Sequence, residues 1–135
     1  MPTVSVVIAD DLTGACEIAG RGLSHGLNSV VNLDTYSTEA DIDLVVIDSD
    51  SRLIPAAQAE AKVEEIASRI PILEETLLYK KTDSVLRGSI QAEVAAMMRA
   101  CKKRSALLVP ANPALGRGIS GGIYSINGTP LSETE

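Results

Sequence analysis

The sequence has no tryptophan and no phenylalanine, and its only aromatic residues are Tyr36, Tyr79 and Tyr124. Stacking platforms for bases or sugar rings are therefore scarce. The net charge of −6 also argues against nucleic acid as the main partner, because phosphate binding needs a basic face. The core has to be aliphatic, in a chain whose 135 residues suit one domain.

Long apolar runs and a secretory leader are also missing. The longest hydrophobic stretches, VSVVIA and LVVI, have the length of strands and are too short to cross a bilayer. The N-terminus MPTV lacks the basic and apolar regions of a signal peptide, which predicts a cytoplasmic protein with no membrane partner. We predict that Cys16 and Cys101, at apolar positions of predicted helices, are buried thiols.

Strand and helix patterns alternate along the chain. Apolar runs predict strands at residues 3–9, 28–33, 42–48, 75–81 and 105–111, and helical spacing predicts helices at about 12–23, 55–70 and 89–103. The first helix is expected to bury Leu12, Cys16, Ala19 and Leu23. The tail, residues 112–135, is rich in glycine and proline and predicts a long loop leading into a small hairpin around Asn127-Gly128.

This alternation predicts an α/β fold with three layers, α/β/α. We expect a five-stranded parallel sheet of order 2-1-3-4-5, covered by helices on both faces, in a single domain over residues 1–135. Ligands bind beyond the carboxyl ends of the strands in such sheets. The polar residues that follow the strands should therefore share one rim: Asp10, Asp11, Asp48, Asp50, Arg52, Lys80, Lys81, Asp83, Arg87, Asn112 and Arg117.

Two carboxylates follow the first strand in the segment IADDLTG. The segment lacks the glycine patterns of dinucleotide and P-loop sites, which argues against phosphate binding at this turn. Carboxylates there can accept hydrogen bonds from hydroxyls, hold Mg²⁺ or act as a base. Asp11 could equally cap the following helix, and Asp10 could interact with the helix dipole. Asp11 can serve both roles.

Basic residues follow the third and fourth strands. Arg52, in DSDSR, suits a substrate carboxylate or an ion pair with Asp48 or Asp50. Strand alternation sends Lys80 and Lys81 to opposite faces, so at least one of them should turn toward the rim. A small polyhydroxylated acid needs carboxylates that accept hydrogen bonds from its hydroxyls and cations that bind its own carboxylate. The predicted rim contains both kinds of side chain.

The loop between the fourth strand and the third helix carries further polar groups. Asp83, Ser84, Arg87 and Gly88 lie just before a helix, where backbone amides and an arginine can meet an anion. The segment PANPALGRG could close over a ligand, dock another domain or be a plain surface connection.

A response-regulator receiver domain is an alternative interpretation. Asp10, Asp11 and Thr82 would fill three of its positions, and Asp48 would be the phosphoacceptor. The fifth predicted strand ends in LLVPANP, so the lysine that would neutralise the acyl phosphate is missing.

Five motifs occur in one order: IADDLTGA, DSR, YKKTDSVLRGSIQAE, VPANPALGRG and INGTPLSET. Together they resemble the N-terminal part of the four-carbon acid sugar kinase family. The resemblance implies an ATP-dependent kinase of threonate, erythronate or oxo-tetronate, which uses ATP and Mg²⁺ in the full-length family. It implies that an N-terminal domain binds the sugar acid and that a C-terminal domain supplies most of the nucleotide site.

Carried over residue by residue, the resemblance makes Asp11 and Asp83 the catalytic candidates, one of which orients or deprotonates the attacked hydroxyl. Thr13, Gly14 and Gly88 would shape the site, and no metal ligand is expected. The implied substrate-binding residues are Asp10, Asp11, Arg52, Lys81, Asp83, Ser84, Arg87, Gly116 and Arg117. Glu17, where aspartate is expected, and Gly118-Ile119, in place of a hydroxyl-rich step, depart from the pattern.

Family members run to several hundred residues, so the resemblance implies that this chain is an incomplete N-terminal domain without its nucleotide domain. We expect it to bind a sugar acid weakly, to bind no cofactor and to turn over no ATP alone. A missing portion can leave an apolar surface uncovered, through which the chain could form a homo-oligomer.

Overall fold

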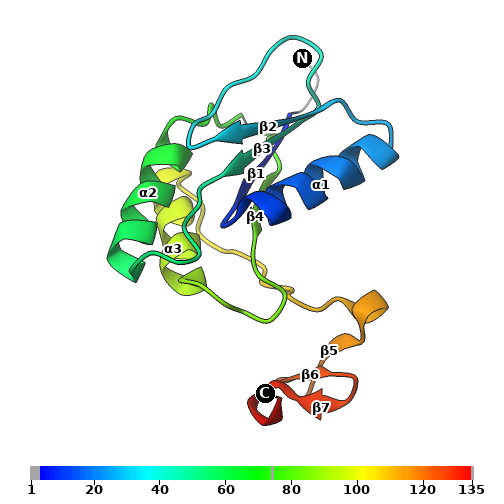
Figure 1. Ribbon diagram of the computed structural model, residues 1–135. Coiled ribbons are helices and arrows are strands. Elements are labelled where there is room, and N and C mark those ends of the chain that lie inside the picture. Colours follow the sequence, from blue (N-terminus) through cyan, green and yellow to red (C-terminus); the bar gives the residue numbers. More distant parts are fainter. Residues whose placement is uncertain (1–3, 74, 135) are drawn as a thin grey trace.

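The computed structural model describes residues 4–73 and 75–134. A parallel sheet of four strands lies between one helix on one face and two helices on the other (Figure 1). These elements form the body, which is followed by a small antiparallel sheet. The elements of the body are β1 (Ser5–Ala9), α1 (Leu12–Ser24), β2 (Ser29–Leu33), β3 (Leu44–Asp48), α2 (Ala56–Ser68), β4 (Leu78–Lys81) and α3 (Ile90–Ala100).

The strand order is β2-β3-β1-β4, which corrects the predicted order 2-1-3-4-5. β3 is buried along its whole length and β1 along nearly all of it. β2 contains Ser29 and Asn32 and is only partly buried, which suits an edge strand. The two most apolar strands thus occupy the centre of the sheet, where helices cover both faces.

The predicted fifth parallel strand is wrong. Residues 105–111 form no strand, and Leu107 and Val109 are 89% and 65% exposed. The apolar run has strand composition, but among the described residues no neighbouring backbone pairs with it. β4 is therefore the second edge of the parallel sheet.

The larger core lies between the sheet and the pair α2 and α3. Ile8 of β1 and Ile47 of β3 are completely buried there. The predicted stripe is present, because Ala59, Val63 and Ile66 of α2 and Ile70, two residues after the helix ends, are all buried. Helical periodicity therefore predicted this interface from the sequence.

The buried face of α1 differs from the predicted one. Leu12 and Leu23 are 51% and 61% exposed, and Cys16 is exposed, whereas Cys101 is buried as predicted. The helix packs through small residues instead: Gly14, Ala15, Ala19 and Gly22. A Cβ at Gly22 would lie 2.5 Å from Ser29 Oγ and 2.6 Å from Leu44 Cδ2, so only glycine permits this close approach.

Residues 112–134, which we call the arm, form the antiparallel sheet. Its strands are β5 (Arg117–Ser120), β6 (Ile123–Ile126) and β7 (Thr129–Pro130). Asn127 and Gly128 link β6 and β7 with φ of 50° and 84°, which confirms the predicted hairpin turn. The arm stands apart from the body at the end of an extended segment (Figure 1). None of the helices in the described part of the chain is long and apolar enough to cross a membrane.

Candidate functional site

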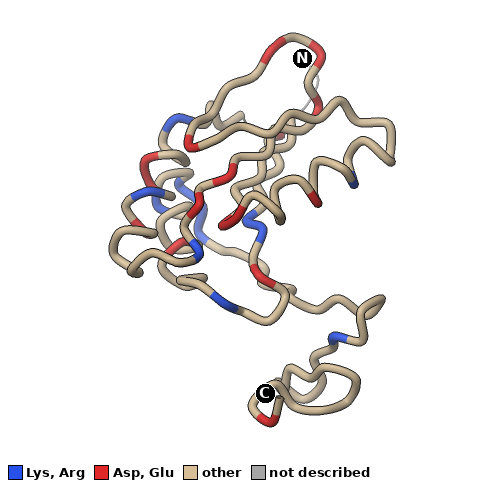
Figure 2. The backbone as a smooth tube through the Cα atoms, in the orientation of Figure 1, with Lys and Arg blue, Asp and Glu red and all other residues tan. Residues whose placement is uncertain are grey.

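The carboxyl ends of β1, β3 and β4 are aligned. Ala9 is in register with Asp48 of β3 and with Lys81 of β4. The loops that leave these strands therefore start side by side. Figure 2 shows acidic and basic positions gathered where β1 and β4 end.

Arg52 lies at the centre of this charged cluster. Its Nε and Nη2 donate hydrogen bonds to Asp10 Oδ2 and Oδ1, both at 2.9 Å. Its Nη1 donates to Asp11 Oδ2 at 2.7 Å and lies 3.8 Å from Asp83 Oδ1. The bidentate contact with Asp10 raises the pKa of Arg52 above its usual range. One guanidinium thus joins carboxylates from the loops that follow β1 and β4.

Two buried serines position the loop that carries Arg52. Ser49 Oγ donates to the carbonyl oxygen of Ala9 at 2.7 Å, and the Ser49 and Ser51 hydroxyls lie 2.8 Å apart. The backbone N–H groups of Ser51 and Arg52 both donate to the carbonyl oxygen of Asp10. Sequence reasoning missed these serines, although their alternation directly after a buried strand is a usable signal.

Asp10 and Asp11 differ in exposure and in partners. The side chain of Asp10 is 3% exposed and is held by Arg52 on both oxygens. The side chain of Asp11 is 26% exposed, and its Oδ1 accepts a hydrogen bond from the Gly14 N–H at 2.9 Å. Asp11 therefore caps α1 and also faces the cluster, as its two expected roles allow.

Asp83 organises its own loop. Its Oδ2 accepts from the backbone N–H groups of Val85 and Arg87 and from Arg87 Nε, while Oδ1 accepts from Arg87 Nη2 at 2.7 Å. These bonds, those from the Arg87 side chain above all, hold the pKa of Asp83 well below its usual range. Gly88, with φ of 87°, packs where a Cβ would lie 3.5 Å from Asp10 Oδ2.

The two lysines of β4 point to different partners. Lys80 Nζ lies 2.7 Å from Glu93 Oε2 of α3, and both side chains are buried. Lys81 faces the other way, toward the start of α1. Its Nζ lies 3.6 Å from Glu17 Oε2 and would lie 3.7 Å from a Cβ at Gly14. Lys81 therefore lies beside the first turn of α1, which Asp11 caps.

Two hydrogen bonds between described residues join the arm to Ser84, the residue after Asp83. Arg117 Nη1 donates to Ser84 Oγ, and the Tyr124 hydroxyl donates to the carbonyl oxygen of Ser84. Sequence reasoning missed Tyr124, whose signal is that it is the only aromatic residue of the tail. Gly116 serves the arm's own geometry, because it has φ of 67° and its carbonyl accepts from the Asn127 N–H.

Asp48, the phosphoacceptor of the receiver alternative, stands beside the cluster without a cation. Burial raises its pKa, and its Oδ1 accepts from the Asp50 N–H at 2.9 Å. Within residues 4–73 and 75–134, no lysine or arginine forms an ion pair with it. Nothing in this arrangement resembles a site prepared for an acyl phosphate.

Neither Mg²⁺ nor ATP fits the cluster. Asp10 and Asp83 are occupied by guanidinium and amide donors, and the segment after β1 has no glycine-rich phosphate motif. No group of metal-ligating side chains large enough to hold an ion occurs in the described part of the chain. The cluster suits a hydroxylated organic acid better than a metal–nucleotide complex.

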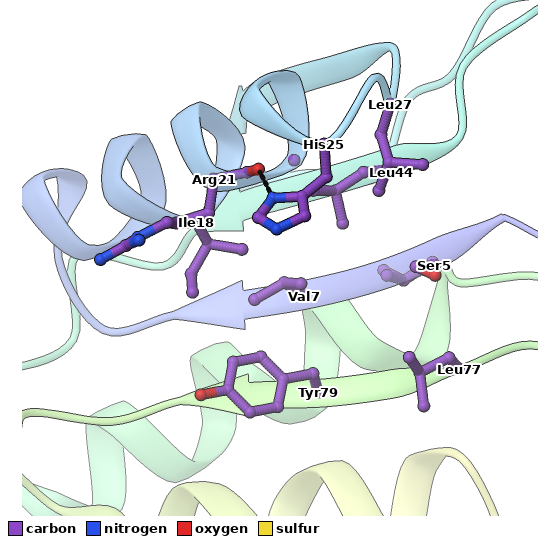
Figure 3. A pocket seen from close by; sticks show the side chains of 11 residues that line it. Ser5, Val7, Ile18, Arg21, His25, Leu27, Leu44, Leu77 and Tyr79 are labelled. Carbon is purple, nitrogen blue, oxygen red and sulfur yellow. Dashed lines mark hydrogen bonds between the residues drawn. The ribbon is translucent and has the colours of Figure 1, made fainter. Parts of the chain in front are cut away.

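An apolar hollow of about 320 Å³ lies elsewhere, between α1 and the edge strand β4 (Figure 3). Tyr79 of β4 and Leu77, the residue just before β4, line the hollow. Val7 of β1 and Ile18 of α1 also line it. Ser5 and Leu44, which also line it, are the first residues of their strands. The hollow therefore lies toward the amino ends of the strands and includes no residue of the charged cluster.

Comparison with known proteins extends over the whole body and the arm. Residues 5–135 match the model of a family described as "Sugar-binding N-terminal domain". D-threonate kinase of Salmonella typhimurium is 40% identical, with 96% of this chain and 31% of that protein covered. 3-oxo-tetronate kinase of Brucella melitensis is 33% identical, with 95% and 31% covered.

A crystal structure from Bordetella bronchiseptica has the same fold. It is described as a domain of unknown function with bound citrate, in a domain-swapped dimer. The TM-score is 0.84 at 29% identity, and the match covers 96% of this chain and 34% of that one. This chain thus spans about a third of the length of the proteins it matches. It belongs to the family of sugar-binding N-terminal domains found in the four-carbon acid sugar kinases.

Proposed function

We propose that this chain binds the sugar-acid substrate of a four-carbon acid sugar kinase, at the carboxyl edge of its parallel sheet. The observation that carries the proposal is Arg52, which holds the carboxylates of Asp10, Asp11 and Asp83 in one cluster. A threonate-like ligand offers hydroxyl donors and one carboxylate. A cluster of fixed carboxylates with cations at its margin complements both kinds of group.

Asp11 is the residue we assign to the attacked hydroxyl. Asp83 is saturated with hydrogen bonds and has a lowered pKa, so it is a poor proton acceptor. Asp11 is more exposed and keeps lone pairs beyond its bonds to Gly14 and Arg52. Phosphoryl transfer depends mainly on how the attacking hydroxyl is oriented, and a fixed carboxylate can orient it.

The carboxylate of the sugar acid is assigned to Lys81 and Arg87. Most of the N–H donors of the Arg52 guanidinium already form hydrogen bonds to Asp10 and Asp11. We therefore assign Arg52 the role of positioning those carboxylates. The Arg87 side chain is 66% exposed and Lys81 Nζ has its nearest carboxylate 3.6 Å away. Both cations therefore keep donors for a ligand. Ser84, Gly116 and Arg117 would form the side of the site toward the arm.

ATP and Mg²⁺ are assigned to the part of the longer relatives that this chain does not cover. Kinases that use ATP need a phosphate-binding site, and the cluster described above does not provide one. In this proposal the whole kinase phosphorylates a hydroxyl of the acid, in the cytoplasm where ATP is available. The chain alone holds the acid without turnover. The comparisons give no support to the receiver alternative.

Self-association is the second part of the proposal. The Bordetella structure is a domain-swapped dimer, and its match to this chain covers 96% of the residues. We infer that this chain also forms a homo-oligomer.

Isothermal titration calorimetry with D-threonate and D-erythronate tests the proposed site. We expect one of these acids to bind the wild-type chain, and Asp11→Asn to weaken binding about tenfold or more, because the negative charge is lost and one acceptor oxygen becomes an NH₂ donor. Asp41→Asn is the matched control, since it removes the same charge from an exposed position outside the cluster. Equal binding by both variants, or no binding by the wild-type chain, would contradict the proposal.

A further inference from the structure

A buried ion pair joins β4 to helix α3. Lys80 Nζ lies 2.7 Å from Glu93 Oε2, and the two side chains are only 7% and 2% exposed. The same ammonium donates a hydrogen bond to the carbonyl oxygen of Lys81, the last residue of β4, at 3.2 Å. Taking two charges out of water is costly, and a buried ion pair often adds no net stability over two apolar side chains of similar volume. The stability of the core therefore does not account for this pair.

The pair lies within the larger core. Lys80 is in register with Ile8 of β1, and side chains in register on parallel neighbours point to the same face of a sheet. Ile8 packs in the core on the side of α2 and α3. Glu93 is buried together with Ala96 and Met97, which share its face of α3. The two charged groups therefore meet between the sheet and α3.

The two partners stand at opposite ends of one loop. Lys80 is the second-last residue of β4, and Glu93 lies in the first turn of α3. Between these elements, residues 82–89 leave the carboxyl end of β4 and return to α3 (Figure 1). This segment, which we call the Asp83 loop, carries Asp83 and Arg87 of the proposed site. The ion pair therefore joins the two ends of the Asp83 loop.

The Asp83 loop has a backbone conformation that its surroundings must maintain. Leu86 has φ of 64°, in the left-handed region that a leucine rarely adopts. Such a conformation persists only where neighbouring contacts fix it. Inside the loop, the Asp83 carboxylate accepts hydrogen bonds from the N–H groups of Val85 and Arg87. At the ends of the loop, the buried ion pair fixes how far the strand and the helix stand apart.

We propose that Lys80 and Glu93 are positioning residues for the sugar-acid site. Their ion pair fixes both ends of the Asp83 loop and thereby places Asp83, whose Oδ1 lies 3.8 Å from Arg52 Nη1, at the cluster. A charge-assisted contact has a preferred distance and direction, whereas apolar side chains can slide past one another. The inference rests on the proposed function, because it gives these two residues a role in binding the same ligand. Both side chains are buried, so they act through the loop.

Replacing the pair with apolar side chains separates positioning from stability. Lys80→Met combined with Glu93→Leu removes both charges together, so that neither charge is left buried alone. We expect this double variant to have a urea midpoint equal to or above that of the wild-type chain. Hydrogen exchange of the Val85 and Arg87 amides, measured by NMR, should nevertheless become about tenfold faster. The amides of β1 and β3 should keep their protection.

Calorimetry with the acid that binds the wild-type chain gives the functional readout. The affinity of the double variant should fall about tenfold, because Asp83 is no longer held in place against Arg52. Glu65→Gln combined with Arg69→Gln is the matched control. These two side chains form an exposed ion pair at the end of α2, so the control also removes one charge of each sign. We expect the control to show the loop exchange and the affinity of the wild-type chain.

A second double variant guards against a leucine that does not fit the core. Lys80→Met combined with Glu93→Gln also removes both charges, and its glutamine keeps the shape of the native side chain. The same faster exchange of the Val85 and Arg87 amides is expected. A urea midpoint well below that of the wild-type chain in both double variants would show that the pair serves stability, and would overturn the inference.

The two readouts distinguish this inference from the proposed function. Wild-type exchange at Val85 and Arg87 in a folded double variant would overturn the positioning role, whether or not an acid binds. Equal affinity of the double variant and the wild-type chain would also overturn it and leave the proposed function standing. If the wild-type chain binds neither acid, the proposed function fails, and the exchange measurement still decides whether the ion pair holds the loop.

Discussion

The body and the arm are held together by different means. Central strands of the body are buried on both faces, and α2 and α3 pack on them through valines, isoleucines and alanines. The arm has short strands, two tight turns and no buried residue. The body therefore carries its own stability, whereas the arm depends on the surface it meets. The charged cluster lies on the body, and two hydrogen bonds between described residues join the arm to Ser84 at its margin.

The largest effect is expected from Arg52→Ala. This change leaves Asp10 and Asp11 close together without their common cation, so the free energy of unfolding should fall by about 3–5 kcal/mol. Arg99→Ala is the control, since Arg99 bridges Glu60 and Glu64 on the exposed side of α2 and α3, where solvent screens the ion pairs, and its loss of stability should be much smaller. Urea denaturation at fixed chain concentration measures both. Similar losses for the two variants would mean that Arg52 does not organise the cluster.

A pair of isoleucines compares the two regions directly. Ile47 of β3 is completely buried, so Ile47→Ala should lower the free energy of unfolding by about 2–5 kcal/mol. Ile123 of β6 is 58% exposed, and Ile123→Ala should change it by less than ~0.5 kcal/mol. Urea denaturation distinguishes them. A large loss at Ile123 would show that the arm is part of the cooperative core.

Two glycines of α1 sharpen the description of the body. Gly22→Ala would force a methyl group against Ser29 and Leu44, at a cost of about 1–3 kcal/mol. Gly20→Ala has open space and should stabilise the helix by about 0.5–1 kcal/mol. Thermal denaturation followed by circular dichroism would show melting temperatures that move in opposite directions. Movement in the same direction would contradict the close packing of α1.

The smallest effect concerns acid stability. The folded pKa of Asp83 is lowered, so an unfolded chain binds a proton at this residue at a higher pH than the folded chain does. The stabilisation is complete above the unfolded pKa of about 3.9 and is lost as pH falls toward the folded value. Asp83→Asn should therefore flatten the loss of stability below about pH 5. Asp48 has a raised pKa and contributes with the opposite sign, so Asp48→Asn should not flatten it.

Local sequence patterns predicted much of the body. Apolar runs marked β1 and β3, and helical spacing marked α2, because these elements bury regular stripes. The rule that ligands bind at the carboxyl ends of parallel strands placed Asp10, Arg52 and Asp83 on one edge, and the structure brings them together. Their roles toward a sugar acid stay predictions.

Other features depend on contacts that no local pattern records. The buried face of α1 consists of glycines and alanines, so its leucines indicated the wrong side. The order of the strands depends on which strand can be buried on both faces, and the polar residues of β2 were the available signal. Residues 105–111 have strand composition but form no strand, because pairing depends on a neighbouring strand that the local pattern does not record. The contact of Tyr124 with Ser84 spans distant segments in the same way.

The central claim is that the sugar acid binds at the Arg52 cluster. Titration of the isotopically labelled chain with D-threonate, followed by the backbone amide signals in NMR spectra, tests it most directly. We predict that the largest shifts occur in residues 10–14, 52 and 81–88. Shifts confined to residues that line the hollow beside Tyr79, or no shifts at saturating ligand, would contradict the claim.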